Sequence, residues 1–419
     1  MSASSDHVIV VGGGVIGAAC AYYLVESGRR VSIVDRGVFG GGSSGGNCGY
    51  VCPSHVLPLA EPGAVARTIQ AMLAPDSPFS IKPRIDPGLW IWLLKFASRC
   101  NRRDMLAAGR GVQPLLESSL ELYRELIARE ALDCEWRTEG LLYVYKDKHA
   151  MEEYAATDRL LTEEFHLPAR RMDGDEAVAF EPALKRGLAG GWYYENDGHL
   201  RPDKLMASLR KKLESRGTTV IENAEVTGFR RRGERATAVV TKTGDYEGDC
   251  FVVAAGAWTP FLGEELGCRP PIQPGKGYSL TMRRPERCPA RPLIFPETRV
   301  AVTPFDSGYR LGSTMEFAGY DESIKQSRLE LLKRGAEPYL VEPYRKPIDE
   351  EWYGWRPMTY DGLPIIDRAP ALDENVWIAA GHNMLGISMA PATGRLIAEL
   401  IAGVKPFIDT APYRATRFI

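Results

Sequence analysis

A glycine-rich turn close to the N-terminus constrains the fold of this chain more than any other feature. A short β-branched run at residues 7–11 leads into the turn at residues 12–17, and residues 18–27 have helical composition. Gly28 then ends the helix as a C′ glycine does, and a second apolar run ends at Asp35. This order of strand, glycine turn, helix and second strand predicts a βαβ unit with G-x-G-x-x-G spacing.

The turn has the chemistry of a dinucleotide site. Its backbone N–H groups can approach a pyrophosphate, and the N-terminus of the following helix adds a favourable dipole. Asp35 follows about 20 residues later, where a carboxylate can accept the hydroxyls of an adenosine ribose. We therefore expect a bound dinucleotide rather than a turn used only for packing. The contacts expected from this unit are Gly12, Gly14, Val15, Ile16, Gly17, Asp35 and Arg36.

The fingerprint alone does not decide between NAD and FAD, but other glycine-rich segments favour FAD. Residues 40–49 follow the second strand at once and carry hydrogen-bond donors, and residues 252–256 and 379–386 form two more glycine-rich strand ends. Because FAD is long, it needs backbone contacts from several such strand ends, so we expect FAD held non-covalently as a prosthetic group. The expected contacts here are Ser43, Ser44, Asn47, Cys48, Gly49, Val226, Ala255, Gly256, Trp258, Gly381, Asn383, Met384, Leu385 and Gly386.

Charge and composition exclude several other classes of protein. The chain has 52 Lys and Arg against 54 Asp and Glu, a net charge of −2, and this balance argues against a nucleic-acid binder. A hydrophobic content of 44% excludes a disordered chain. The eight cysteines include no C-x2-C pair, so we expect reduced thiols and no metal site.

Two features of the sequence bear on location. Residues 1–7 lack the basic start of a signal peptide, and no apolar run reaches the length of a membrane span, so we expect a cytoplasmic protein. Residues 89–97 form a short aromatic segment with basic residues on both sides. The segment predicts either a half-buried helix or an interfacial helix on an anionic membrane face, which leaves a peripheral contact with the inner membrane face open.

The order of predicted elements indicates two interleaved domains. Nucleotide-type segments lie at both ends and in the middle, whereas residues 276–315 alternate like an antiparallel sheet. We predict an α/β and α+β fold, in which a Rossmann-type FAD-binding domain is interleaved with a substrate domain built on an antiparallel sheet. The last helix is expected from about Pro391 to Ala402. The predicted FAD-binding segments are 1–84, 198–265 and 355–419, and the substrate-binding segments are 85–197 and 266–354.

At this point the sequence resembles the D-amino acid oxidase-like flavoprotein superfamily. The superfamily has a glycine fingerprint, a serine-rich patch, a central Ala-Ala-Gly, a late Arg-Pro motif and a Gly-His loop, and here these are residues 12–17, 43–49, 254–256, 355–364 and 381–386. Four further segments look like those of bacterial D-amino acid dehydrogenases, a branch that includes enzymes of D-proline and D-hydroxyproline. They are residues 44–53, 58–63, 276–280 and 356–359.

The resemblance implies a substrate site and a reaction. Arg356 falls where the superfamily has the arginine that binds the substrate carboxylate through two parallel hydrogen bonds. Tyr278 is a candidate second contact to the carboxylate or amine, and His382 and Asn383 are candidates for contacts to the flavin ring or the substrate. The implied reaction is hydride transfer from Cα of an amino or imino acid to flavin N5, with electrons passing to a quinone or another carrier.

Aromatic side chains supply candidates for the pocket walls. Tyr50 and His55 are candidates for lining the entry to the substrate pocket. One wall of that pocket has three aromatic candidates, Trp352, Tyr353 and Trp355. For each of these residues the alternative is ordinary packing in the core. Three alternatives to the dehydrogenase also stay open. They are an oxygen-using oxidase of glycine, sarcosine or L-proline, a non-catalytic flavin-binding subunit, and a pyridine-nucleotide dehydrogenase.

Overall fold

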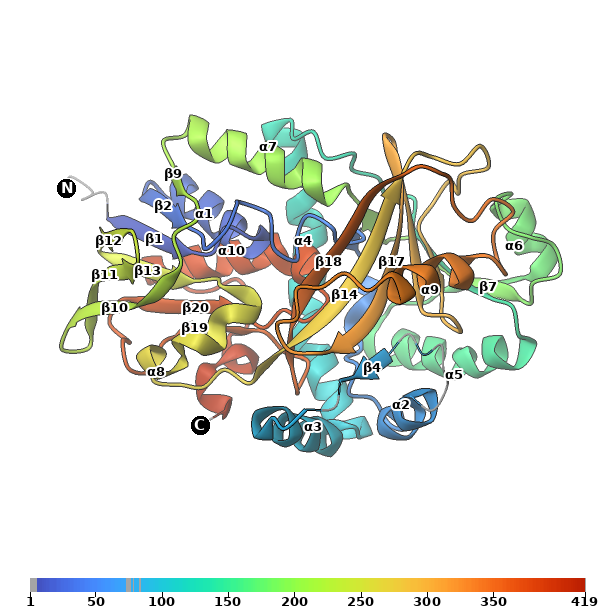
Figure 1. Cartoon of the computed structure of the whole chain (residues 1–419), viewed down its shortest axis with the longest axis horizontal. Helices are drawn as coiled ribbons and strands as arrows, with labels where there is room; N and C mark the ends of the chain where they lie inside the picture. The colour runs from blue at the N-terminus through green and yellow to red at the C-terminus, as the bar shows by residue number, and fades with distance from the viewer. Residues whose placement is uncertain (1–5, 73–76, 78, 83, 419) are drawn as a thin grey trace.

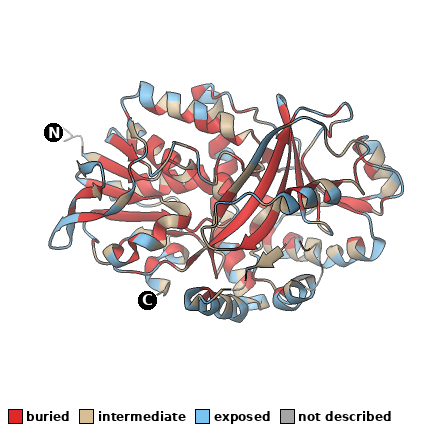
Figure 2. Ribbon diagram, viewed as in Figure 1, coloured by how far each residue is buried: buried red, intermediate tan, exposed pale blue. Residues whose placement is uncertain are grey.

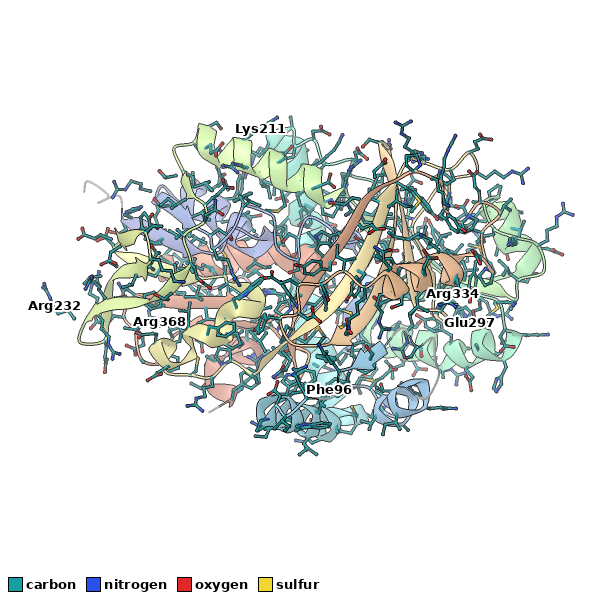
Figure 3. All side chains as sticks on the ribbon, in the orientation of Figure 1. Phe96, Lys211, Arg232, Glu297, Arg334 and Arg368 are labelled. Carbon is teal, nitrogen blue, oxygen red and sulfur yellow. The ribbon has the colours of Figure 1, made fainter. Side chains whose placement is uncertain are left out.

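The molecule contains two large β-sheets, which follow one another along its long axis (Figure 1). The computed structural model describes residues 6–72, 77, 79–82 and 84–418. Residues 1–5, which belong to the segment where we expect no signal peptide, lie outside the described residues. Long charged side chains such as those of Lys211 and Arg232 project from the periphery (Figure 3), while the strands of both sheets are mostly buried (Figure 2).

The first sheet has six strands and contains the predicted βαβ unit. Its order is β19-β20-β13-β1-β2-β9, and every neighbouring pair is parallel except β19–β20. Val8, Ile9 and Val10 of the central strand are fully buried, as in a parallel sheet covered on both faces. The bounds are β1 (His7–Val11), β2 (Arg30–Val34), β9 (Thr219–Ile221), β13 (Cys250–Val253), β19 (Ile365–Arg368) and β20 (Val376–Ala380).

Different layers cover the two faces of this sheet. Val8 and Val10 pack under four helices, and Ile9 and Val11 pack against a small antiparallel sheet and the turns that follow β13. The helices are α1 (Val15–Glu26), α4 (Arg102–Glu130), α7 (Pro202–Ser215) and α10 (Gly386–Ala402). The small sheet is β10 (Val226–Arg232), β11 (Arg235–Thr241) and β12 (Gly244–Glu247), and the turns are η2 (Gly256–Leu262) and α8 (Gly263–Leu266).

The start predicted for the last helix is wrong by five residues, because α10 begins at Gly386 and contains Pro391. A proline inside a helix leaves the carbonyl four residues earlier without its N–H donor. Here that carbonyl belongs to Ile387, and it accepts the hydroxyl of Tyr123 at 2.9 Å. A side chain from α4 therefore replaces the missing helical hydrogen bond.

The second sheet has nine strands in the order β18-β14-β17-β16-β15-β5-β7-β6, with β4 paired to β17. It is antiparallel except for the β5–β15 and β4–β17 pairs. This confirms the predicted fold class. The strands are β4 (Phe79–Ile81), β5 (Leu141–Tyr145), β6 (Arg170–Asp173), β7 (Gly190–Tyr194), β14 (Ile272–Met282), β15 (Leu293–Phe295), β16 (Val300–Phe305), β17 (Gly308–Phe317) and β18 (Ile348–Thr359).

The remaining elements connect or cover the two sheets. A short ladder, β3 with β8, joins the segment after the glycine-rich loop to the segment before α7. Among the described residues, no helix has both the length and the apolar composition to cross a bilayer. The bounds are β3 (Tyr50–Val51), η1 (Pro53–Val56), α2 (Ala64–Met72), α3 (Pro87–Arg99), α5 (Lys148–Phe165), α6 (Gly174–Phe180), β8 (Gly198–His199), α9 (Gln326–Ala336), η3 (Ala411–Tyr413) and η4 (Ala415–Phe418).

Three elements depart from the predicted domain boundaries. Strand β4 pairs with β17 of the second sheet, although its residues lie in a predicted FAD-binding segment. Helix α4 packs with α10 in the core of the first sheet, although its residues lie in a predicted substrate-binding segment. Strand β18 runs across the predicted boundary at 355 because its whole length pairs with β14. We keep the interleaved division as a proposal, with these three elements reassigned.

Candidate active site

A cavity of about 490 Å³ opens at the carboxyl ends of the parallel strands. Its lining includes Val11, Val34, Ala254 and Ala380, which end or directly follow β1, β2, β13 and β20. Ligands of open α/β sheets bind at this edge. The sequence-predicted residues that line the cavity are Gly12, Gly14, Val15, Ile16, Asp35, Arg36, Ser43, Ser44, Asn47, Val226, Ala255, Gly256, Trp258, Arg356, His382, Asn383, Met384 and Gly386.

Five predicted cofactor contacts are absent from this lining. They are Gly17, Cys48, Gly49, Gly381 and Leu385. The first has a packing role, because a Cβ at Gly17 would lie 1.8 Å from the carbonyl oxygen of Gly12. Cys48 and Leu385 border a second cavity instead. The structure therefore brings most, but not all, of the predicted set to one surface.

The glycine turn presents donors suited to a dinucleotide. Helix α1 begins at Val15, whose N–H donates to the Ser44 hydroxyl at 3.0 Å, and its first turn carries no acidic side chain. An ideal Cβ at Gly14 would meet only that hydroxyl, at 3.4 Å, so the turn leaves an open cradle. The positive end of a helix beside such a cradle favours a phosphate.

Asp35 and Arg36 shape the cavity beyond the turn. The Asp35 carboxylate accepts the N–H of Gly13 at 2.6 Å and that of Gly37 at 2.7 Å, and each of its oxygens keeps a free lone pair. The Arg36 guanidinium lies over the Trp258 ring, 4.5 Å from its centroid. These acceptors and the helix terminus fit the ribose and the pyrophosphate of FAD.

A second cavity of about 390 Å³ adjoins the first. The two share Ser43, Asn47, Arg356, Asn383 and Met384. Much of the remaining lining is aromatic or apolar. It contains Tyr50 and His55, the candidates for the substrate entry, and Trp352, a candidate for the pocket wall. Its aromatic members include Tyr50, His55, Phe96, Tyr143, Tyr154 and Trp352. A cavity of this kind suits a small molecule whose polar end is held at the junction.

Arg356 projects from β18 over a glycine at the junction of the cavities. A Cβ at Gly277 of β14 would lie 2.2 Å from Arg356 Nη1, so only glycine leaves room for the guanidinium there. Nη1 donates to the Thr314 carbonyl at 2.8 Å and Nη2 to the Ser313 carbonyl at 3.5 Å. Both carbonyls lie where β17 adopts positive φ angles.

In the part of the chain that the structure describes, no carboxylate forms an ion pair with Arg356. Burial lowers the pKa of Arg356 from its ordinary value, and the nearby Cys48 thiol opposes this shift. An arginine stays protonated even so, and it has five N–H donors. A carboxylate that enters the second cavity therefore meets a partly buried cation with free donors.

Tyr278 and His382 are placed differently from Arg356. Tyr278 borders the second cavity, but its hydroxyl donates to Glu316 at 2.9 Å and its ring packs with Leu280, because alternate residues of β14 face away from Gly277. His382 is buried with Nε2 3.0 Å from the Thr393 hydroxyl, and burial lowers its pKa to about 3. The catalytic roles of both residues stay predictions.

The wall candidates separate in the structure. Trp352 lies over Gly46, where a Cβ would be 2.0 Å from the indole Cδ2, and it lines the second cavity. Tyr353 packs beside Lys276, whose Nζ is 4.5 Å from its ring centroid, and Trp355 packs edge-on against Trp258. Of the three, Trp352 alone belongs to the described lining of the second cavity.

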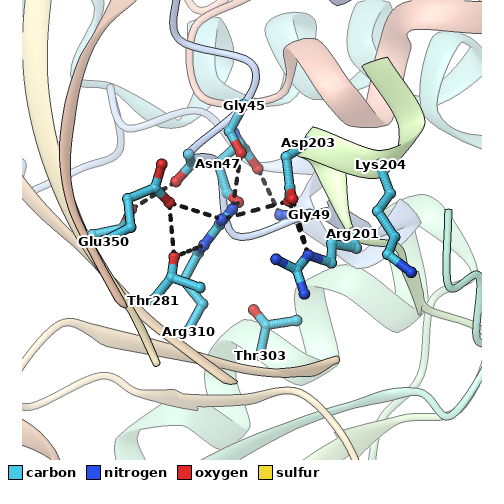
Figure 4. A network of polar contacts seen from close by, with 12 residues as sticks. Gly45, Asn47, Gly49, Arg201, Asp203, Lys204, Thr281, Thr303, Arg310 and Glu350 are labelled. Carbon is cyan, nitrogen blue, oxygen red and sulfur yellow. Dashed lines mark hydrogen bonds and ion pairs between the residues drawn. The ribbon is translucent and has the colours of Figure 1, made fainter. Parts of the chain in front are cut away.

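Arg310 is a residue that the sequence analysis missed (Figure 4). It is buried on β17, where it donates to the carbonyls of Gly45 at 3.0 Å and Asn47 at 2.6 Å, and to the Thr281 hydroxyl at 2.9 Å. It thereby fixes the loop that brings Ser43, Ser44 and Asn47 to the first cavity. In the sequence, Arg310 alternates with apolar residues like a solvent-facing strand position, so no local signal identifies it.

Comparison with known proteins agrees with this geometry. A family model described as FAD dependent oxidoreductase matches residues 7–400. The chain is 30% identical to D-amino acid dehydrogenase of Granulibacter bethesdensis over 418 residues, which covers 98% of this chain and 99% of the relative. It is also 30% identical to D-amino acid dehydrogenase of Methylobacterium nodulans over 424 residues, 99% of both chains.

Solved structures share the fold at lower identity. Glycine oxidase of Geobacillus kaustophilus superposes with a TM-score of 0.80 at 23% identity, over 99% of this chain and 100% of that chain. L-proline dehydrogenase of P. horikoshii superposes with a TM-score of 0.71 at 20% identity, over 99% and 98%. At these identities the likeness concerns the arrangement of the two sheets.

The family match also covers the parts from which the site is built. It begins at β1 and ends within α10, so it includes the glycine turn, the loop fixed by Arg310, and Arg356. A cavity with the donors for a dinucleotide at the carboxyl ends of the strands is what a protein of this family requires. On this match, and on relatives that cover nearly the whole chain, the protein belongs to the FAD-dependent oxidoreductase family.

Proposed function

We propose that this chain is an FAD-dependent dehydrogenase of D-amino acids, or of cyclic D-imino acids such as D-proline and hydroxy-D-proline. The observation that carries the proposal is the partly buried Arg356 guanidinium, which has free donors where the two cavities meet. Support for the D-configuration comes from the names of the relatives at 30% identity. The compact, aromatic second cavity supports a cyclic or apolar side chain.

Arg356 acts by orienting the substrate. A planar guanidinium binds a carboxylate through two parallel hydrogen bonds, and the carbonyls of Ser313 and Thr314 hold it in place from the other side. Such orientation aims the substrate Cα at the first cavity, so most of the catalysis is positioning. When bound, FAD supplies the acceptor for the Cα hydride at N5.

No residue of the site has to remove a proton by strong base catalysis. Oxidation of a neutral amine by hydride transfer needs only a deprotonated amine, and His382 is held by Thr393. The imine product then hydrolyses to a 2-oxo acid and ammonia, or stays a cyclic imine. Trp352 and the other aromatic walls limit the access of water to the cavity.

We also propose that FAD is bound non-covalently and that electrons leave to a quinone or another carrier. Burial raises the pKa of the Cys48 thiol and so disfavours the thiolate that attachment requires. Precipitation of the holoprotein with acid tests the first point, because a non-covalent flavin leaves the pellet. The transfer of electrons to a carrier is supported by the name of the relatives, which are called dehydrogenases.

An anaerobic panel of D- and L-amino acids tests the function. We expect D-proline, hydroxy-D-proline or another D-amino acid to bleach the flavin absorbance, and the L-enantiomers to leave it unchanged. Bleaching by L-proline, glycine or sarcosine alone would overturn the stereochemical assignment, and a flavin that no amino acid bleaches would indicate a non-catalytic subunit. Aerobic peroxide formation compared with dye reduction then separates an oxidase from a dehydrogenase.

A further inference from the structure

His55 brings a neutral imidazole ring to the wall of the second cavity. It belongs to η1, lines the cavity and is half-buried. Among the residues that the structure describes, neither of its ring nitrogens has a hydrogen-bond or ion-pair partner. Burial lowers its pKa to about 4. The ring is therefore uncharged at about pH 7, and it presents one N–H donor and one nitrogen acceptor.

The position of His55 is fixed from two sides. The buried carboxyl group of Asp197 accepts the backbone N–H of Ser54 at 3.2 Å and also the hydroxyl of that residue, which holds the backbone just before His55. The centroid of the imidazole ring lies 6.1 Å from that of Tyr50 and 6.2 Å from that of Tyr143, with the second pair edge-on. The imidazole is therefore in place before a ligand arrives, which lowers the entropic cost of binding.

Two tyrosine hydroxyls of the same cavity already have partners. The Tyr50 hydroxyl donates to two backbone carbonyls, at 2.9 Å each. The Tyr154 hydroxyl shares a hydrogen bond of 2.8 Å with that of Tyr194. The imidazole of His55 is therefore better placed than these hydroxyls to meet a polar group of the substrate.

The rest of the wall offers little to a charged side chain. Apart from Arg356, the described lining has one charged side chain, Glu61, and this carboxylate pairs with Arg67. Helix α3, the half-buried helix expected from residues 89–97, adds Phe96 to the apolar part of the wall (Figure 3). A second charge on the substrate would therefore enter the cavity without a free counter-ion.

This chemistry selects among substrate side chains. A purely apolar side chain would cover His55 and leave its donor and its acceptor without partners, which costs free energy. A charged side chain would lose its hydration without gaining an ion pair. A neutral hydroxyl suits the imidazole best, because it both donates and accepts and can therefore pair with either ring nitrogen.

We propose that His55 selects for a hydroxyl on the ring of a cyclic D-imino acid, so that hydroxy-D-proline is preferred to D-proline. The inference rests on the proposed function. Arg356 lines both cavities and holds the carboxylate at their junction, whereas His55 lines the second cavity alone. His55 would therefore meet the part of the substrate that points away from the first cavity. A ring carries its hydroxyl in a fixed direction, which matches an imidazole that is itself fixed.

The hydrogen bond would form away from the reacting Cα. It would therefore be made equally in the ground state and in the transition state, and such binding lowers KM while kcat stays almost unchanged. The net gain from one neutral hydrogen bond corresponds to a preference on the order of tenfold. A residue that only supports the fold would not change this preference.

Steady-state kinetics in an anaerobic dye assay test the inference, with D-proline and both epimers of 4-hydroxy-D-proline as substrates. In the wild type, we expect kcat/KM for one epimer to exceed that for D-proline on the order of tenfold. His55→Leu should abolish this preference through KM, at unchanged flavin content. His55→Asn and His55→Gln each place an amide near one of the two ring nitrogens, so one of them should restore part of the preference. His149→Leu, at a histidine of α5 whose side chain is 82% exposed, is the matched control and should keep the wild-type preference.

The outcomes separate this inference from the proposed function. If the wild type oxidises D-proline without preferring either epimer, or if His55→Leu keeps the preference, the role of His55 is refuted and the proposed function stands. Oxidation of acyclic D-amino acids alone would likewise refute the role of His55 and leave the dehydrogenase in place. A loss of preference through kcat alone would assign His55 to the chemical step instead. If no D-substrate bleaches the wild-type flavin, the proposed function fails, and the inference fails with it.

Discussion

The glycine beneath the guanidinium of Arg356 offers a sharp test of the site. In the Gly277→Ala variant, the three nearest atoms to the new Cβ all belong to this guanidinium, at 2.2, 2.4 and 2.4 Å. Ordinary contacts of a Cβ begin at 3.4 Å, so the guanidinium has to retreat by about 3.4 − 2.2 = 1.2 Å. Because these atoms end a flexible side chain, the strands should still pair and FAD should stay bound.

The expected effect follows from this displacement. A misplacement of about 1 Å in a positioning group costs on the order of 10²-fold in rate. This corresponds to about 2.7 kcal/mol of transition-state stabilisation. We expect kcat/KM for the best D-amino acid to fall by about that factor, at unchanged flavin content, in an anaerobic dye assay. Gly228→Ala is the matched control, since its Cβ would meet nothing closer than 3.5 Å.

A double-mutant cycle separates this explanation from general damage. Arg356→Ala alone should cost on the order of 3 kcal/mol, the loss of a charge-assisted pair with the substrate carboxylate. With the guanidinium removed, the methyl group of Gly277→Ala has room, so the double variant should be no worse than Arg356→Ala. Additive losses, or wild-type kinetics in Gly277→Ala, would refute the view that Gly277 acts through Arg356.

The remaining predictions concern the cofactor and stability. Gly14→Val fills the cradle beside Ser44, so the purified variant should be colourless; a yellow, active protein would contradict the placement of the pyrophosphate. Arg310→Met leaves the carbonyls of Gly45 and Asn47 without donors, at about 1–3 kcal/mol each, so heating should release flavin fluorescence at a lower temperature than in the wild type; an unchanged release temperature would argue against the clamp. Asp197 is buried and its pKa is raised to about 7 by burial, so the folded state binds its proton more tightly than the unfolded state does, and stability is lost as pH rises from about 4 to 7. The free energy of unfolding of Asp197→Asn relative to that of the wild type should therefore be higher at about pH 8 than at about pH 5. An equal difference between the two proteins at both pH values would show that Asp197 does not titrate in this range.

Much of the cofactor cavity was predictable from the sequence. The strand, the glycine turn, helix α1 and Asp35 are consecutive along the chain, and the distances between them are set by turn chemistry and helical periodicity. The strand ends at 254–256 and 379–386 were also recognisable, because glycine clusters after apolar runs mark where parallel strands stop. Each of these signals lies within a short stretch of the chain, so it can be recognised in the sequence without a structure.

The tertiary structure decided which distant residues meet. Arg310 holds Gly45 across 265 positions of sequence, and Gly277 makes room for Arg356 only because β14 pairs with β18. Tyr278 and Gly277 are neighbours in sequence and face opposite sides of the sheet, and only the pairing of β14 with β18 decides that Gly277 lies beneath Arg356. Turn and helix signals act over a few residues, whereas strand pairing brings together segments whose spacing along the chain carries no record of the contact.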